Sequence, residues 1–419
     1  MPVAWPLAFL VGAFALPPAA DPDALLLHYQ QRATDYFRAE ADPRTGLVKD
    51  RAANFEDDSY TVSSLAATGF GLATLPIAAE RGWRSAAGAR EQTRVTLTYL
   101  LRDMPHEHGW YYHFVDMRTG ERVWNCELSS IDTALLLAGA LTAGAYFGGE
   151  IETLANDIYE RVDFPWMLTD GGEKPESMTL CHGWKPESGF LRSRWDSYSE
   201  HMILYLLAIG SPTHPIPAEA WNAWSRPEGE YAGYRTYRVG PLFTHQFSQA
   251  FVDFRGIVDG DGRDYWQSSV NATLANRQFC IDNADAYDTY GPDLWGLSAC
   301  DGPDGYRAYS APPGREEHDG TVAILATLAS LPFTPDRVRS FAGHLMATHG
   351  DRVWGKYGFT DALNIDRQFW APDVIGIDVG AAAVMIENHG SGLVWEQFGR
   401  VPAVRRGLDA AGFHAADER

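Results

Sequence analysis

Cysteine is scarce in this sequence, which disfavours the classes of protein that depend on it. The 419 residues include only four cysteines, Cys126, Cys181, Cys280 and Cys300. None belongs to a Cys-x-x-Cys motif or lies near a histidine at zinc-finger spacing. Cys181 and His182 are adjacent, which is poor geometry for sharing a metal ion. We therefore expect four buried thiols and no metal site, with disulfides as the alternative.

Positive charge is also in short supply. The chain has 34 Lys and Arg residues against 55 Asp and Glu residues, which gives a formal net charge of −21. A protein this acidic repels the phosphates of nucleic acids and of anionic membranes. Binding to nucleic acid or to a membrane surface is therefore disfavoured, whereas a neutral polymer such as a glucan is compatible with this charge.

No hydrophobic run predicts a membrane span in the mature protein. The most apolar stretch covers residues 3–16 and is followed by Pro17-Pro18-Ala19-Ala20, so it is too short and too interrupted by proline to span. This order is typical of a signal peptide with a small-residue cleavage site, and residues 1–20 are a candidate signal peptide. A periplasmic or secreted location is therefore expected. No Lys or Arg precedes the run, although a signal peptide normally begins with positive charge, so a cytoplasmic location stays open.

Motifs of several enzyme classes are missing too. The sequence contains no P-loop and no serine nucleophile elbow. Gly69-Phe70-Gly71 lacks the third glycine and the preceding strand of a dinucleotide fingerprint. We therefore expect no cofactor.

Helical periodicity is what the sequence has in abundance, and apolar and amphipathic patterns alternate. The expected helices cover residues 23–40, 63–81, 86–103, 130–147, 150–162, 197–209, 217–224, 243–254, 264–282, 320–331, 334–349 and 376–398. Such alternation is expected when an inner ring of buried helices is wrapped by an outer ring. The sequence thus predicts an all-α (α/α)6 toroid of about twelve helices over residues 22–400, with a C-terminal tail at residues 401–419.

Long loops rich in glycine, proline and aromatic residues join these helices, and long ordered loops are usually functional. They cover residues 105–124, 167–195, 227–242 and 283–319, with a short strand expected at residues 109–116. Aromatic rings stack on the C–H faces of sugars, so a glycan cleft is one interpretation, and packing inside the loops is the other. The aromatic candidates are Trp110, Tyr111, His113, Trp124, Trp184, Trp195 and Trp295. Arg194 is a candidate for binding sugar hydroxyls, or for pairing with Asp196.

Three carboxylates lie at expected starts of buried helices, where burial would raise their pKa. Inverting cleavage of a glycosidic bond needs an acid and a base about 6.5–9.5 Å apart. Glu200 is the first candidate, although Ser197-x-x-Glu200 equally fits a helix capping box. Asp378, with Asp373 as a rival, and Asp132, which follows Ser129 by three residues, are each open to a capping role as well.

A series of motifs in fixed order resembles a known family. The motifs lie at residues 67–72, 80–83, 109–114, 124–134, 211–216, 240–246, 354–359, 376–380 and 385–388. In these residues the chain resembles the glycoamylase-like proteins, a group that includes the endo-β-1,2-glucanases of glycoside hydrolase family 144. The resemblance implies an (α/α)6 barrel and an anomer-inverting hydrolase of β-1,2-glucan.

The same resemblance implies roles for individual residues. Glu200 matches the position of the general acid, Asp378 that of a candidate base, and Asp132 a third acidic position. Some members carry further acids just before the Asp132 position, where this chain has only Glu127, a second candidate for substrate binding. We therefore predict a hydrolase with an oligo- or polysaccharide as its partner and a monomeric state as the simplest expectation. A glycosidase or transglycosylase of another linkage, and a glycan-binding protein without catalysis, are the alternatives.

Overall fold

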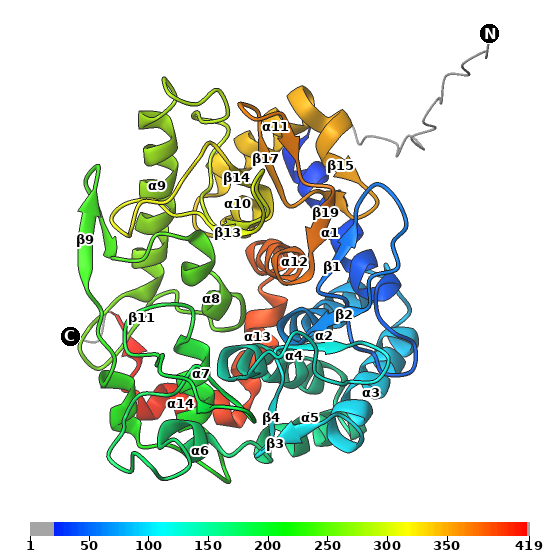
Figure 1. Cartoon of the computed structure of the whole chain (residues 1–419), viewed down its shortest axis with the longest axis vertical. Coiled ribbons are helices and arrows are strands. Elements are labelled where there is room, and N and C mark those ends of the chain that lie inside the picture. Colours follow the sequence, from blue (N-terminus) through cyan, green and yellow to red (C-terminus); the bar gives the residue numbers. More distant parts are fainter. Residues whose placement is uncertain (1–20, 417–419) are drawn as a thin grey trace.

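The computed structural model describes residues 21–416, so the candidate signal peptide at residues 1–20 lies outside the described residues. Two layers of helices surround a common centre (Figure 1), and the predicted (α/α)6 toroid is confirmed. Six helices form the inner layer: α2 (Leu65–Glu80), α4 (Ser130–Phe147), α7 (Met202–Ile209), α8 (Phe247–Phe251), α10 (Ile324–Ala329) and α12 (Gly376–Gly390). Almost every residue of these helices is buried, as their continuous apolar sequence requires.

The remaining helices cover the inner layer and are amphipathic where they face solvent. They are α1 (Pro22–Ala39), α3 (Ala86–Arg102), α5 (Glu150–Glu160), α6 (Phe164–Leu168), α9 (Tyr265–Asp282), α11 (Pro335–Val353), α13 (Leu393–Arg400) and α14 (Pro402–Ala410), with two 3-10 helices, η1 (Ala218–Asn222) and η2 (Leu242–His245). By length and composition α4 could cross a membrane, but it is 78% buried inside the protein.

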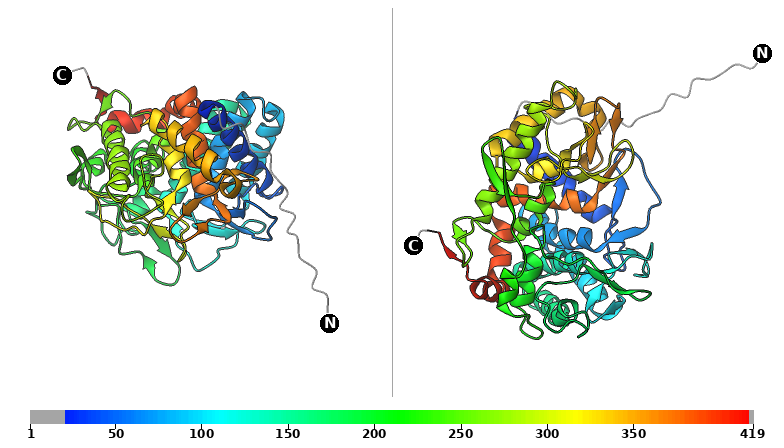
Figure 2. Two further views of the ribbon diagram at one scale, coloured as in Figure 1. Left: turned by 90° about the horizontal axis from the view of Figure 1, so that it is seen from above. Right: turned by 60° about the vertical axis from the view of Figure 1, so that its left-hand side comes forward.

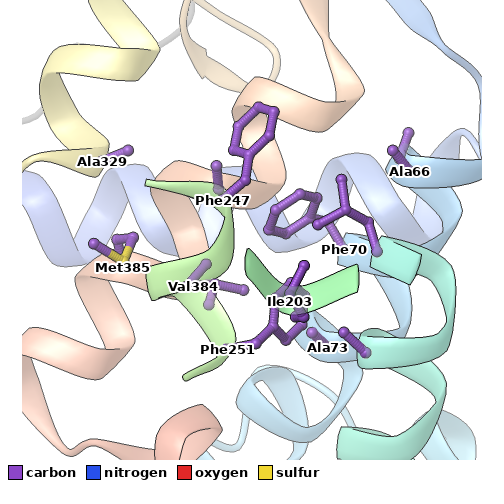
Figure 3. Packing of buried hydrophobic residues seen from close by; sticks show 14 of the residues in the cluster. Ala66, Phe70, Ala73, Ile203, Phe247, Phe251, Ala329, Val384 and Met385 are labelled. Carbon is purple, nitrogen blue, oxygen red and sulfur yellow. The ribbon is translucent and has the colours of Figure 1, made fainter. Parts of the chain in front are cut away.

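The inner ring closes because its first and last helices pack together. α2 lies against both α4 and α12, α4 continues to α7, and α8 and α10 return to α12. Figure 3 shows side chains from these helices meeting at the centre, among them Phe70 of α2 and Phe247 and Phe251 of α8. The ring of Phe70 lies 5.8 Å from that of Phe247 and 5.3 Å from that of Phe251. This packing fills the middle of the toroid with apolar side chains.

Two glycines let α2 and α4 approach closely. Gly69 of α2 and Gly139 of α4 face each other, and a Cβ atom on Gly139 would lie 1.8 Å from the carbonyl oxygen of Gly69. The obstacle is backbone and cannot rotate away, so any side chain here must push the two helices apart.

Replacing Gly139 with alanine should therefore destabilise the protein. Overpacking of this kind costs about 1–3 kcal/mol or more, to be measured as the free energy of unfolding in urea. Gly343→Ala is the matched control, because a Cβ there meets only Pro22 Cγ at 3.8 Å in the middle of α11. The control should be neutral or gain about 0.5–1 kcal/mol. Equal stability of the two variants would contradict the close approach.

The strands are short ribbons of two or three antiparallel members, and most of them lie with the long loops toward one face of the ring, whereas β20 lies near the C-terminus on the other side (Figure 2). They are β1 (Arg51–Ala53), β2 (Val62–Ser64), β3 (His106–Glu107), β4 (Trp110–Tyr111), β5 (Phe114–Asp116), β6 (Leu128–Ser129), β7 (Gly183–Lys185), β8 (Gly189–Phe190), β9 (Glu228–Tyr231), β10 (Tyr234–Tyr237), β11 (Ile257–Val258), β12 (Ala299–Cys300), β13 (Arg307–Ala308), β14 (Val322–Ala323), β15 (Trp354–Gly355), β16 (Gly358–Phe359), β17 (Ala362–Asn364), β18 (Phe369–Trp370), β19 (Asp373–Ile375) and β20 (His414–Ala415). Strands β2, β6, β14 and β19 each run directly into an inner helix, so the N-termini of those helices open on the same face.

Several element boundaries differ from the sequence prediction. The helix expected at residues 197–209 begins only at Met202, and residues 217–224 form the short 3-10 helix η1. The helix expected at residues 376–398 is broken into α12 and α13, because Gly392 adopts a left-handed conformation with φ 74°. Residues 402–416, in the segment expected as a tail, contain α14 and β20. α14 packs on α7 so closely that a Cβ on Gly407 would lie 2.2 Å from Leu206 O.

Candidate active site

Three carboxylates from distant parts of the chain line one cavity of about 170 Å³ at the mouth of the toroid. Asp132 is the third residue of α4, Asp378 is the third residue of α12, and Glu200 lies in the turn just before α7. All three were predicted from the sequence, and closure of the helix ring brings them together. The first turn of a helix carries unpaired N–H groups and a positive dipole end, so this mouth can hold several acids.

Glu200 lies outside α7, and this removes its alternative role as a capping residue. The N-cap of α7 is His201 and has no side-chain cap, while Ser197 lies four residues further from the helix. The carboxylate of Glu200 instead accepts a hydrogen bond from Ser199 Oγ and faces the cavity. Burial raises the pKa of Glu200 above its usual range, and the negative charge of Asp132 adds to the increase, although the Ser199 hydrogen bond opposes it. These are the conditions for a carboxyl group that keeps its proton.

Asp378 is nearly inaccessible and is not the N-cap of its helix, which is Ile375. Its Oδ2 atom is buried and has no hydrogen-bond partner among residues 21–416. Burial and the negative charge of the neighbouring Asp361 raise the pKa of Asp378 well above its usual range. Burial and the charge of Asp301 raise the pKa of Asp361 itself to about 8. Asp378 in the wall of the cavity and the neighbouring Asp361 therefore favour holding a proton between them.

Arg51 is the arginine that pairs with acidic residues near Asp361 and Asp378. Arg51 Nη1 lies 2.9 Å from Asp301 Oδ2 and 3.6 Å from Asp373 Oδ2, and Arg51 Nε lies 3.6 Å from Asp50 Oδ2. Asp373 of β19, the rival candidate for the base, therefore pairs with Arg51 of β1. Asp373 is not among the residues that line the cavity. Asp361 was not singled out from the sequence, because no local pattern signals a buried aspartate between β16 and β17.

Asp132 is linked to two other predicted residues. His113 Nε2 lies 3.5 Å from Asp132 Oδ1, and His113 Nδ1 lies 3.0 Å from Glu127 Oε1. Ser129 caps α4 by accepting a hydrogen bond from the Asp132 N–H at 3.2 Å, and its hydroxyl donates to Asp132 Oδ2 at 2.5 Å. The expected cap is therefore present, and Asp132 reaches the cavity all the same.

Apolar side chains form much of the cavity wall, and the sequence did not point to them as site residues. They are Ile131, Leu135, Phe243, Phe247, Ala299, Tyr306 and Ile377. Ile131, Phe247 and Ile377 belong to the first turns of inner helices, where an apolar residue is expected as ordinary core. Tyr306 is 55% exposed in the loop between β12 and β13, so it can contact a bound ligand at the rim. The mixture of apolar surface and a few carboxylates suits a sugar, whose faces are apolar and whose edges are polar.

Three predicted substrate-binding aromatics do not face the cavity. Trp110, Tyr111 and Trp295 are fully buried. Trp110 Nε1 donates to Asp163 O, Tyr111 Oη donates to Leu100 O, and Trp295 packs edge-on against Phe341. These three rings do not bind substrate as predicted, because a wide toroid with long loops needs large side chains to fill the space beneath those loops.

Arg194 and Trp195 also serve the structure of the loop. Arg194 Nη1 donates to the buried Asp170 carboxylate at 2.6 Å, and its other nitrogens bind backbone oxygens of Leu168 and Thr179. Trp195 is 7% exposed and donates from Nε1 to Ser130 Oγ at 2.9 Å. Arg194 therefore ties together residues within the segment 167–195, and Trp195 holds this segment against α4.

Two tryptophans keep accessible surface near the carboxylates. Trp184 is half-buried in β7, next to β6, which leads into α4. Trp124 is 62% exposed, and its ring lies 5.0 Å from that of Phe114. Trp124 and Asn125 both adopt left-handed backbone conformations, with φ 56° and 50°. Such conformations are unusual for residues other than glycine and often mark functional loops.

Over residues 21–416 no group of three or more His, Cys, Asp or Glu side chains is placed to hold a metal ion. The four cysteines are free thiols and buried, as expected. The cavity contains three acids: Glu200, whose carboxyl group favours its protonated form, the buried Asp378 on the opposite side of the ring, and Asp132 between His113 and Ser129. Such a set can give and take protons at a bond placed between helices α7 and α12.

Comparisons with known proteins agree with this chemistry. The Glycoamylase family model, described as "Putative glucoamylase", matches residues 192–402, about half of the chain. An exo β-1,2-glucooligosaccharide sophorohydrolase of Parabacteroides distasonis is 28% identical over 92% of this chain, which spans 57% of the length of that relative. A solved endo-β-1,2-glucanase of Chitinophaga pinensis, in complex with sophorotriose and glucose, is 28% identical with a TM-score of 0.84, covering 96% of this chain and 99% of the other. A solved structure from Bacteroides caccae, described like the family model, is 30% identical with a TM-score of 0.85, covering 94% of this chain and 100% of the other.

Proposed function

The chain belongs to the glycoamylase-like family, and from this we propose that it is a glycoside hydrolase that cleaves β-1,2-glucan with inversion of the anomeric carbon. One observation carries the proposal: Glu200, Asp132 and Asp378 line a single cavity although two come from separate helices and the third from the turn before α7. The relatives named as β-1,2-glucan hydrolases at 28% identity support the choice of substrate.

In the proposed reaction Glu200 is the general acid. The raised pKa of Glu200 keeps its proton available for the glycosidic oxygen, which leaves as a hydroxyl group when the C1–O bond breaks. When the pair Asp361 and Asp378 holds a single proton, Asp361 carries it and the ionised Asp378 is the general base. Asp378 then takes a proton from a water molecule, whose oxygen forms the new bond to C1 from the opposite side. Attack from the opposite side turns the β-linkage into a product with the α-configuration.

Asp132 and the exposed aromatics would position the sugar. Asp132 lies in the wall of the cavity and accepts hydrogen bonds, so it suits a glucosyl hydroxyl. Tyr306 lines the cavity and Trp124 is exposed in the loop between His113 and Asp132, and both suit the apolar faces of glucosyl units.

A panel of linear and cyclic glucans, β-1,2-glucan included, tests the proposal. We expect β-1,2-glucan to be cleaved to short oligosaccharides, and proton NMR during the first minutes to show the α-anomer before mutarotation equilibrates it. A first-formed β-anomer would contradict inversion. Cleavage of another linkage would point to a different glycosidase on this fold, and binding without any product would point to a glycan-binding protein.

A further inference from the structure

A histidine lies between two carboxylates in the wall of the cavity, and both of its ring nitrogens are occupied. His113 Nδ1 contacts Glu127 Oε1 at 3.0 Å, and His113 Nε2 lies 3.5 Å from Asp132 Oδ1. A neutral imidazole has only one N–H, so an acceptor at each nitrogen favours the doubly protonated imidazolium. Burial alone would lower the pKa of His113, but the charges of Asp132 and Glu127 outweigh it and raise the pKa above its ordinary value.

Several backbone contacts fix this histidine in place. Its N–H donates to Glu127 O at 2.9 Å, and its carbonyl oxygen accepts from Leu65 N at 3.2 Å at the start of α2. The imidazole stacks on Phe114, with ring centroids 3.8 Å apart. Glu127 is confined in turn, because a Cβ on Gly183 would lie 2.7 Å from Glu127 Cγ. The three residues are therefore held in one arrangement.

His113 Nδ1 is bonded to Glu127 at 3.0 Å and His113 Nε2 lies 3.5 Å from Asp132, so each ring nitrogen has a protein carboxylate beside it. The contribution of His113 to the cavity is the position of Asp132. Asp132 Oδ2 accepts from Ser129 Oγ and Oδ1 faces His113, so both oxygens are fixed. A carboxylate held from both sides has one orientation toward the cavity.

We propose that Glu127 and His113 are positioning residues, in which Glu127 keeps His113 a cation and His113 holds Asp132 in its working orientation. The catalytic part of this inference rests on the proposed glycoside hydrolysis. The positioning part does not, because it concerns the protonation state of one histidine. Neither Glu127 nor His113 then has substrate binding as its main role, in contrast to the role predicted for both from the sequence.

The charged groups around the histidine determine what a substitution does. Asp132 of α4, Glu127 before β6 and Asp50 before β1 face His113, and Lys185 and His182 face Glu127. Removing the Glu127 charge leaves two carboxylates near His113. Its pKa should then fall toward the ordinary value near 6.5.

The experiment is an NMR titration of the histidine nitrogens in the wild-type protein and in Glu127→Gln, with kcat/KM measured on β-1,2-glucan across the same pH range. In the wild type we expect both nitrogens of His113 protonated at neutral pH. In the variant we expect the pKa of His113 to fall by about 1–3 pH units. Activity of the variant should be near wild type where His113 is still protonated, and should fall by up to about 100-fold as pH rises and Asp132 loses its partner.

Glu121→Gln is the matched control, because it makes the same change at an exposed glutamate of the same loop. It should leave both the titration and the activity unchanged. A neutral His113 in the wild type at neutral pH, or a loss of activity in Glu127→Gln that is the same at every pH, would overturn the proposal. The titration needs no substrate, so an altered His113 in a protein that cleaves no glucan would count against the proposed function and not against the positioning role. If Glu127→Gln does not fold, the wild-type titration decides.

Discussion

Glu200→Gln should lower kcat/KM on β-1,2-glucan by about 10²–10⁴-fold, the range typical of a lost general acid. Glutamine keeps the size of the side chain and its contact with Ser199, but it has no proton to give to the leaving oxygen. The loss should be much smaller on an aryl glycoside with a dinitrophenol leaving group, because that group departs as an anion without being protonated. Rates on the two substrates, measured side by side, test the role of Glu200 as well as its importance.

The control for this variant is Glu187→Gln in the same loop, an exposed glutamate bound to Arg122 at 2.6 Å. It should keep full activity, since surface ion pairs contribute little to stability. Near-wild-type activity of Glu200→Gln would contradict its assignment. An equal loss on both substrates would indicate that Glu200 binds the substrate and is not the general acid.

Asp378→Asn should abolish hydrolysis to a similar degree, by about 10²–10⁴-fold, because the water would lose its base. In contrast to Glu200→Gln, a better leaving group should not restore the rate, since the step lost is activation of water. The same variant should also become more stable at neutral pH. The burial of Asp378, with one oxygen unpartnered among the described residues, opposes the folded state whenever the carboxyl is ionised.

The sign of the pH dependence follows from the raised pKa of Asp378. The unfolded chain releases this proton above about pH 3.9, whereas the folded protein retains it to higher pH. The wild type therefore loses stability from this group as pH rises from about 4 toward neutrality, and the asparagine variant does not. Urea unfolding at several pH values should show the difference growing with pH in favour of the variant.

Glu387→Gln is the contrasting control on the same helix. Glu387 is fully buried near the end of α12, but its carboxylate is paired with Arg81 at 3.0 Å and with Gln30 at 2.8 Å. Its replacement should destabilise the protein and leave catalysis intact. An Asp378→Asn protein that is less stable than wild type at neutral pH would contradict the electrostatic account of the site, whatever its activity.

Helix positions were predictable where the sequence had a long periodic pattern. The segments at residues 23–40, 86–103, 130–147 and 264–282 differ from α1, α3, α4 and α9 by no more than a residue or so at either end. Predictions failed where tertiary contacts set the boundary. Residues 197–201 extend as a turn before α7, because Ser197 pairs with Ser225 and Tyr198 N–H donates to Ser225 O, which holds the chain out of the helix.

For the aromatic residues, too, tertiary contacts decided what the sequence could not predict. Sequence composition indicated many tryptophans in long loops, but it could not say which rings would be buried under the loops and which would be left at the surface. Trp110 and Trp295 are buried, whereas Trp124 is exposed in a turn with a left-handed backbone conformation. No sequence pattern near Trp124 predicts this turn. Asp361 is a further case, because it lies between β16 and β17, and its charge raises the pKa of Asp378 at the start of α12 only through the folded structure.

The sequence by itself determined that this protein is an acidic helical toroid and, through its motifs, the family to which it belongs, because helical periodicity and residue identity are local properties. It also named the three carboxylates of the cavity, since each lies at the start of an apolar helix. Only the tertiary structure decided that these carboxylates meet, that Asp361 lies behind one of them and that His113 joins two others. Distances across a closed ring depend on how all the helices pack, and no segment of the chain contains that information alone.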